Sequence, residues 1–321
     1  MAEPKKRGCL GCSFPVLIIV VIIALGIVVI GFLAGPLGKS IVGDIGLPSW
    51  LSVSAPEPNL PAPVLFHVFG LPITNTIIAG WITVVFLAVV SWLITRRIKL
   101  VPGRLQTTFE FILGWVYDFC TSVAGEKNGR KFFPVICTIF LFVAFNAWLS
   151  LIPGFGSIQI HIHGHEYELL RGSNTDLNTP LAIALVSFVF VEYYGLKTLG
   201  IKYMRKFVNV GGFFSSVGHV FKGRVKKGLT GLFSGLIDIF VGGLETLSEL
   251  IRIVSFTFRL FGNMTAGEIL IMVAAFLLPM AVSWLVYGLE LLVGFIQALV
   301  FSGLTLAFAS MAVASHEEEA H

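Results

Sequence analysis

The chain has 321 residues, of which 56% are hydrophobic and only 12% are charged. A soluble domain is usually about a quarter charged, so this composition excludes a separate soluble domain. The formal net charge of +4 comes from basic residues in short clusters, which does not indicate nucleic-acid binding. Several apolar runs approach the roughly 20 residues that span a bilayer as a helix, and they predict an all-α polytopic membrane protein.

Residues 1–35 form an N-terminal apolar segment. Its apolar run, residues 14–33, follows three basic residues and is either a retained membrane helix or a signal peptide. Cys9 and Cys12 precede the run in a C-x-x-C spacing. This spacing suits a redox or metal pair, but no second pair completes a zinc site, which favours two unremarkable thiols.

A loop and a helical core are predicted for the rest of the chain. Residues 36–74 are rich in proline and glycine and predict an extended extracytoplasmic loop. Glu110 and Asp118 interrupt the apolar segment at 104–124, which suits an interfacial or hairpin helix better than a full span. The core covers residues 75–321, with helices predicted near 76–95, 104–124, 132–152, 181–196, 228–278 and 280–313.

The last two predicted helices are too long for upright spans. With about 35–50 residues each, they run roughly 50–70 Å, whereas the hydrocarbon core is only about 30 Å thick. We therefore expect both helices to lie steeply tilted or bent within the membrane, although ordinary tilts average about 20°.

The distribution of basic residues predicts the orientation. With the N-terminus inside and six crossings, the basic segments 96–104, 127–131 and 197–227 lie inside together with the C-terminus. The loops at 36–74 and 155–177 then fall outside, and both are poor in lysine and arginine.

His161, His163 and His165 alternate along the predicted outer loop. On a strand they would share one side, as metal ligands do, but a single run without a second cluster favours a surface loop. The sequence therefore predicts neither a metal nor another cofactor.

Arg259 is the most informative residue. It lies near the middle of the fifth predicted helix, where insertion of an arginine costs at least about 2.5–3.5 kcal/mol, so a polar partner must face it. Ser255, Gly262 and Asn263 are its neighbours on the helix face, and the small residues let another helix come close. In a purely structural alternative, Arg259 pairs with an acidic residue of its own chain, namely Glu245, Glu249 or Glu290.

Acidic residues flank Arg259 on both sides. Glu245 lies toward the predicted cytoplasmic end, and Glu268 lies nine residues beyond Arg259 on the opposite helical face. Glu290 and Gln297 are two turns apart on one face of the last helix. This arrangement suits two separate aqueous paths that meet near an arginine. The alternative is a chance scatter of carboxylates at the membrane interface.

The ten residues from Arg259 to Glu268, R-L-F-G-N-M-T-A-G-E, resemble the signature of subunit a of F-type ATP synthases. Further similarity covers most of the chain from about residue 69, in segments that begin at Phe69, Val101, Leu149 and Asp176. The chain departs from the family pattern in its added residues 1–35. It also has Glu290 where relatives often have histidine.

The resemblance implies a proton-conducting stator subunit without catalytic activity, because no bond is made or broken in it. Two offset half-channels would face a rotating c ring, and Arg259 would couple proton movement to rotation and ATP synthesis. Glu268 and Glu290 would line the outer path and Glu245 the inner path. The remaining residues implied in proton translocation are Gln297, Asn263 and Ser255.

The same resemblance implies the partners: the c ring, b-type peripheral stalk subunits and the rest of the ATP synthase complex. It also implies a multi-pass protein of a bacterial-type plasma membrane, for which the distribution of basic residues predicts a cytoplasmic C-terminus.

Two other classes of function compete with this interpretation. A secondary transporter would bind an anionic substrate at Arg259, but such folds often show internal repeats and broken helices, and neither is seen around Arg259. A non-conducting membrane anchor would not need a central arginine.

Overall fold

The structure is a computed structural model that describes residues 14–43, 55, 61–96, 98–99, 101–152, 154–155, 158–162, 165–200, 203–204, 207, 225–278 and 283–314. Within these residues, five helices are long and apolar enough to cross a membrane, or six if one bent pair counts as a single span. The prediction of an all-α polytopic membrane protein is thereby confirmed. Cys9, Cys12, the end of the C-terminal tail and most of the basic segment 197–227 lie outside the described residues.

The chain divides into two compact units, and each contains part of the last two helices. The first unit comprises Met1–Pro61 and Asn263–Val293, and the second comprises Ala62–Gly262 and Gly294–His321. In the first unit, helix α1 (Phe14–Ala34) bends by 78° into the short helix α2 (Pro36–Val42). Pro36 starts α2, where its missing N–H costs nothing.

Residues 36–74 are not the plain extended loop that the sequence predicts. Besides α2, they contain the antiparallel strands β1 (Val64–Val68) and β2 (Leu71–Thr74). Phe69 and Gly70 connect the strands, and both have positive φ, 51° and 82°. Two such residues make the tight turn whose twist fits a hairpin. The sequence prediction missed this hairpin because its short apolar strands follow a segment rich in proline.

Five longer helices follow in the chain: α3 (Asn75–Arg96), α4 (Arg104–Ser150), α5 (Asn178–Leu199), α7 (Val225–Leu277) and α8 (Ser283–Ala314). The predicted helices at 104–124 and 132–152 are both part of α4. Gly125, with φ 73° and ψ 162°, breaks the helical path between two arms. The arms pack on each other, since the rings of Trp115 and Phe140 lie 5.8 Å apart. The hairpin prediction for the first arm agrees with this geometry.

The outer segment with the histidines also forms a hairpin in place of an irregular loop. Strands β3 (Gln159–Ile162) and β4 (His165–Glu168) pair antiparallel, with His161 opposite Glu166. His163 lies outside the described residues. Within the part of the chain that is described, no three histidine, cysteine or acidic residues are grouped to hold a metal ion.

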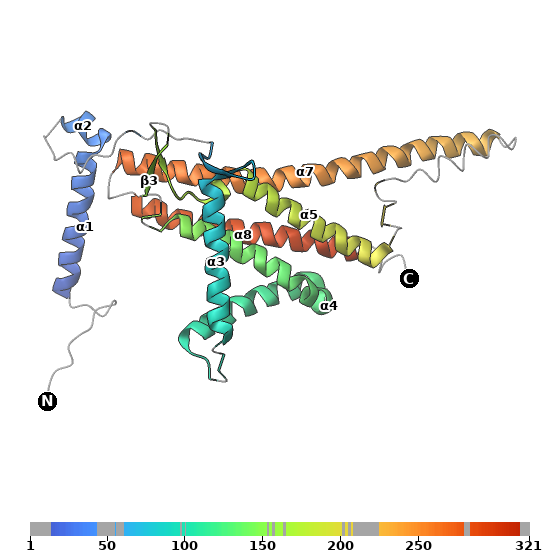
Figure 1. The fold of residues 1–321 in the computed structure, drawn as a ribbon, viewed down its shortest axis with the longest axis horizontal. Coiled ribbons are helices and arrows are strands. Elements are labelled where there is room, and N and C mark those ends of the chain that lie inside the picture. The colour runs from blue at the N-terminus through green and yellow to red at the C-terminus, as the bar shows by residue number, and fades with distance from the viewer. Residues whose placement is uncertain are drawn as a thin grey trace. The chain divides into compact units, whose positions relative to one another are not determined.

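Aromatic and hydroxyl contacts hold the helices of the second unit together. Phe132 of α4 packs edge-on against Phe190 and Tyr194 of α5, with ring centroids 5.7 and 4.8 Å away. Ser187 of α5 and Thr305 of α8 share a buried hydrogen bond of 2.7 Å. In Figure 1 the ribbon of α3 runs across the direction shared by α5, the C-terminal part of α8 and the second arm of α4.

The lengths of α7 and α8, 53 and 32 residues, agree with the predicted long pair. The apolar stretch of α7 has 45 residues, or about 68 Å. It fits a hydrocarbon core of about 30 Å only at about 60° or more from the membrane normal.

This tilt is testable with spin labels at Leu236 and Val254, which are both exposed on one face of α7 and 18 residues apart. In a bilayer-embedded chain without its four native cysteines, the two label depths should differ by about 13 Å or less. Power-saturation electron paramagnetic resonance measures both depths. A difference of about 27 Å, as in an upright helix, would contradict the tilt.

Candidate functional site

Arg259 lies on the surface of the second unit. The buried face of α7 carries Phe256 and Leu260, and the Phe256 ring packs 4.9 Å from that of Phe301 on α8. Arg259 and Ser255 are on the exposed side of the helix. The packing of α7 on α8 therefore turns the arginine outward.

Another arginine on the same stripe of α7 is paired inside the protein. Arg252, two turns before Arg259, forms a bidentate ion pair with Glu249, with N–O distances of 2.7 and 2.9 Å. Its guanidinium carbon also lies 3.7 Å from the centre of the Phe308 ring. Glu249 is 3% exposed, so its charge is neutralised inside the protein by Arg252.

The ion pair removes Glu249 as a partner of Arg259. Among the described residues of the second unit, none forms an ion pair or side-chain hydrogen bond with the Arg259 guanidinium. The structural alternative of pairing with Glu249 is thus wrong. An exposed guanidinium in a membrane helix still needs a polar partner, and that partner must approach from outside this surface.

A second polar cluster lies at the end of α5. Tyr203, from the connection after α5, is buried and donates a 3.3 Å hydrogen bond to Glu192. Its ring occupies the space beside Gly195, where an added Cβ would lie 2.6 Å from the ring carbon Cζ. Burial raises the pKa of the Tyr203 phenol, and the nearby carboxylates of Glu192 and Glu249 raise it further. The phenol therefore remains a hydrogen-bond donor.

The first unit brings Glu290 of α8 against α7. Glu290 is 6% exposed, and its carboxyl group lies directly against the backbone of Gly267, where any Cβ would overlap it. Glu268 follows Gly267 on α7 and is half-buried. The Glu290 carboxyl is therefore placed at the turn of α7 that carries Glu268. Thr265, also buried, adds a hydroxyl to this turn.

The other sequence-predicted site residues are also on α7 and α8. Glu245 is half-buried on α7 in the second unit, and Asn263 is exposed on α7 in the first. Gln297 is half-buried on α8, one turn after Gly294, in the second unit. Gly294 packs on α4, since its added Cβ would lie 2.8 Å from the Ala147 methyl group.

Sequence reasoning missed a buried polar cluster that joins α3, α4 and the turn before α5. The Asn146 amide nitrogen donates to Thr83 at 3.0 Å, and its oxygen accepts from the backbone N–H of Asn174 at 3.2 Å. Thr76 of α3 donates to the Asp176 carboxylate at 2.8 Å. A lone asparagine inside the apolar run of α4 was the available signal.

These features define a polytopic helical membrane protein with an outward-facing arginine and buried carboxylates in its last two long helices. Comparison with known proteins then identifies the family. The sequence model described as ATP synthase A chain matches residues 77–310. The chain belongs to this family, the a subunits of F-type ATP synthases.

Individual relatives agree with the family assignment. The chain is 31% identical to "ATP synthase subunit a" of Desulforamulus reducens over 268 residues, which cover 80% of this chain and 86% of that protein. It is 32% identical to "ATP synthase subunit a" of Gloeobacter violaceus over 248 residues, which cover 76% and 85%. The matches extend over nearly the whole length of both relatives.

The contact between Gly267 and Glu290 predicts that even a small substitution at Gly267 lowers the stability of the chain. Gly267→Ala should destabilise the chain by about 1–3 kcal/mol, the usual range for overpacking, because the methyl group displaces the carboxyl. Gly243→Ala, also in α7, is the matched control, since nothing lies within 4 Å of its added Cβ. It should be neutral or stabilising, because alanine favours helix.

The measurement is thermal unfolding of the full chain in detergent. Adding Glu290→Ala to Gly267→Ala should restore much of the loss, because the carboxyl that overlaps the methyl group is gone. Equal stability of the Gly267→Ala and Gly243→Ala variants would show that Glu290 does not occupy this space.

Proposed function

We propose that the chain is the proton-conducting stator subunit of an F-type ATP synthase, in which Arg259 couples proton movement to rotation of a c ring. The observation that carries the proposal is the exposed guanidinium of Arg259 on α7, beside large exposed apolar side chains such as Val254 and Phe258. An exposed charge at this position is too costly to face lipid. It suits a partner that presents a carboxylate within the membrane.

The surroundings of Arg259 suit a broad apolar partner. Leu250, Val254 and Phe258 of α7 are each more than half exposed. A ring of membrane helices with one carboxylate per subunit matches both this apolar face and the single positive charge. Ser255 and Gly262 add little bulk beside Arg259, so a partner helix comes close.

Arg259 then has two roles. It attracts each deprotonated ring carboxylate that passes, and its fixed charge repels protons that would leak directly between the two half-channels. Arginine suits both roles because its guanidinium stays protonated. The internally paired Arg252 leaves Arg259 as the arginine of this stripe that is available to the ring.

The carboxylates supply the two proton paths. In this proposal Glu268 of α7 and Glu290 of α8, whose carboxyl group lies against the neighbouring Gly267, form the outer relay, and Glu245 lines the inner path. Polar groups that complete the paths are Asn263, Gln297 and Ser255.

The proposal also covers the partners and location. The chain works with the c ring, b-type peripheral stalk subunits and the rest of the complex, in a bacterial-type plasma membrane, with its C-terminus in the cytoplasm. It makes and breaks no covalent bond, and so it is not an enzyme by itself.

A secondary transporter that binds an anionic substrate at Arg259 is the second candidate. Its binding site would be expected between broken helices, whereas α7 is helical throughout Val225–Leu277. Purification of the chain under mild conditions discriminates the two functions, because ring and soluble ATPase subunits copurify only with the stator.

The central prediction concerns the charge at position 259. Arg259→Ala should abolish proton-driven ATP synthesis while the complex still assembles, since the residue lies outside the packed core. Arg259→Lys should fail largely as well, because lysine is a compact, strongly hydrated charge without the planar fork. ATP synthesis by inverted membrane vesicles is the measurement.

Arg130→Gln serves as the control for Arg259→Ala, because Arg130 is an exposed cation of α4 and is distant from Arg259 in the sequence. Its synthesis rate should match wild type. Near-normal synthesis in Arg259→Ala vesicles would rule out the proposed coupling.

The outer relay gives a separate prediction. Glu268→Gln and Glu290→Gln should each slow proton-driven synthesis severalfold, because either change removes one of the two carboxylates of the proposed outer relay. The double variant should be little slower than the single ones if both residues serve one step. Synthesis rate is measured against the pH on the extracytoplasmic side, which is the lumen of inverted vesicles. Single variants that match wild type throughout would make both residues ordinary interface carboxylates.

A further inference from the structure

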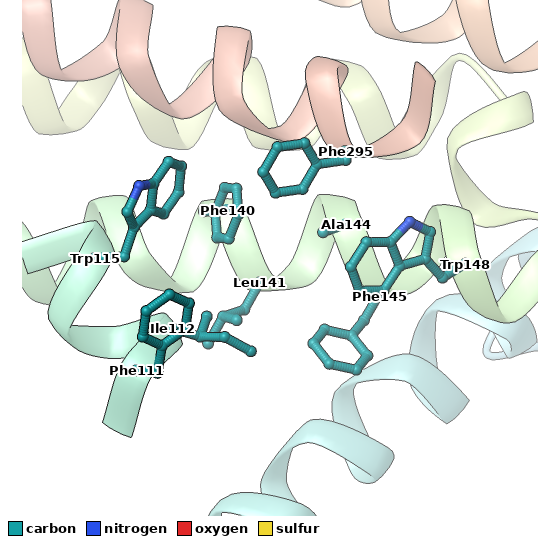
Figure 2. A pocket seen from close by; sticks show the side chains of 9 residues that line it. All are labelled: Phe111, Ile112, Trp115, Phe140, Leu141, Ala144, Phe145, Trp148 and Phe295. Carbon is teal, nitrogen blue, oxygen red and sulfur yellow. The ribbon is translucent and has the colours of Figure 1, made fainter. Parts of the chain in front are cut away.

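An apolar cavity of about 230 Å³ lies in the second unit, between the two arms of α4 and helix α8. The side chains around it are Phe111, Ile112, Trp115, Phe140, Phe145 and Phe295, with Leu141, Ala144 and Trp148 completing the wall. Figure 2 shows the aromatic rings of both arms and of Phe295 arranged around it. None of the residues that line it belongs to the proposed proton paths.

The lining excludes water and favours a hydrocarbon. Its walls consist of aromatic and aliphatic side chains, and a water molecule needs two to four polar partners. An apolar cavity of roughly 150 Å³ already stays dry and takes up benzene, and this cavity is larger. A rigid frame keeps it open, since the rings of Trp115, Phe140 and Phe295 contact one another at 5.8–6.1 Å.

The cavity opens beside the first arm of α4. Phe111 is 73% exposed and Trp115 is 40% exposed, although both line the cavity. Leu105, Phe111 and Trp115 expose large apolar side chains along this arm, so the mouth is suited to contact with lipid chains. An acyl chain can therefore enter without crossing water.

Two cations lie along the chain before the mouth. Arg104, Phe111 and Trp115 share one face of the first arm, at spacings of seven and four residues. Arg104 is exposed and lies about 10 Å before Phe111 along the helix axis. Lys99 is held beside the same turns, because the Gln106 side chain bonds to both its backbone N–H and its carbonyl, at 3.2 and 3.1 Å.

The charge at this end of α4 is net positive. Glu110 contributes one negative charge, and its carboxylate accepts a 2.7 Å hydrogen bond from Gln106. Lys99 and Arg104 outnumber it. A negatively charged group bound at Arg104 thus lies about 10 Å along the helix axis from Phe111. Part of an acyl chain can span this distance and reach the dry aromatic cavity.

We propose that this cavity binds one acyl chain of an anionic phospholipid whose phosphate is held by Arg104 and Lys99. The aromatic walls select a hydrocarbon, and the two cations select the headgroup. The site makes the α4 hairpin a specific lipid-binding element, independent of the proposed role of Arg259.

The test uses tryptophan fluorescence of the full chain in nanodiscs. Phenylalanine replaces Trp50, Trp81, Trp92 and Trp284, so that only the two cavity tryptophans remain. Phosphatidylglycerol or phosphatidylcholine with a brominated acyl chain is added to unbrominated phosphatidylcholine. Brominated phosphatidylglycerol should quench saturably, at about a fivefold lower mole fraction than brominated phosphatidylcholine, because a cation near the bilayer surface has about this effect on anionic lipid.

Variants separate the two halves of the site. Ala144→Leu should remove the saturable phase by filling the cavity, and Leu141→Phe, at a half-buried position, replaces it if Ala144→Leu does not fold. Arg104→Gln should keep the saturable phase but abolish the preference for phosphatidylglycerol. Arg130→Gln, the matched control in the second arm of α4, should leave both unchanged.

The complete ATP synthase provides the second measurement. Native mass spectrometry should detect one tightly bound phosphatidylglycerol fewer in the Ala144→Leu complex than in wild type. Linear quenching that is equal for both lipids and unchanged by Ala144→Leu would mean ordinary boundary lipid and overturn the proposal. Equal lipid counts in both complexes would overturn it as well, because a partner subunit would then fill the cavity.

Discussion

Hydrocarbon cannot hydrogen-bond, and this constraint governs how the polar side chains of the described membrane helices are arranged. A polar side chain within the membrane must find a partner inside the protein or present itself to one outside. Asn146 meets Thr83 and Asn174, and Ser187 meets Thr305. Because these bonds join different helices, they determine how α3, α4, α5 and α8 pack, while the apolar side chains fill the space between them.

Two arginines on one stripe of α7 illustrate both outcomes of this constraint. Arg252 is neutralised by Glu249 and stacked on Phe308, so it fastens α7 to α8. Arg259, two turns later, is exposed. The ion pair between Arg252 and Glu249 helps to fix the helix that carries Arg259. Under the proposed function, a fixed helix lets Arg259 meet each ring carboxylate in the same position.

The sequence predicted the elements better than their contacts. Long apolar runs located the membrane helices within a few residues, because hydrophobic length reflects the bilayer directly. The hairpins β1–β2 and β3–β4 were missed, since strands of four or five residues leave little periodic signal. The cluster around Asn146 was missed because its partners lie 63 and 28 residues away in the chain.

The site was predictable to the same extent. An intramembrane arginine points to function from sequence alone, but only packing shows which acidic residue already has a partner. Glu249 was a reasonable partner for Arg259 by its position in the sequence. Its ion pair with Arg252 could be recognised only from the structure. Gly267 lay within the recognised motif, yet its contact with Glu290 depends on the approach of α8, which no local pattern encodes.

The steep tilt predicted for α7 and α8 also bears on the aromatic cavity. A helix that lies far from the membrane normal covers its neighbours over much of its length but leaves less protein at other depths of the bilayer. The hairpin of α4 packs beside α8, where large rings such as Trp115 and Phe295 meet at 6.1 Å. Rings of this size cannot interlock as closely as small side chains do, so a gap remains between the arms. In a membrane, the available hydrocarbon is a lipid chain. In our proposal, Arg104 and Lys99 determine which lipid supplies it.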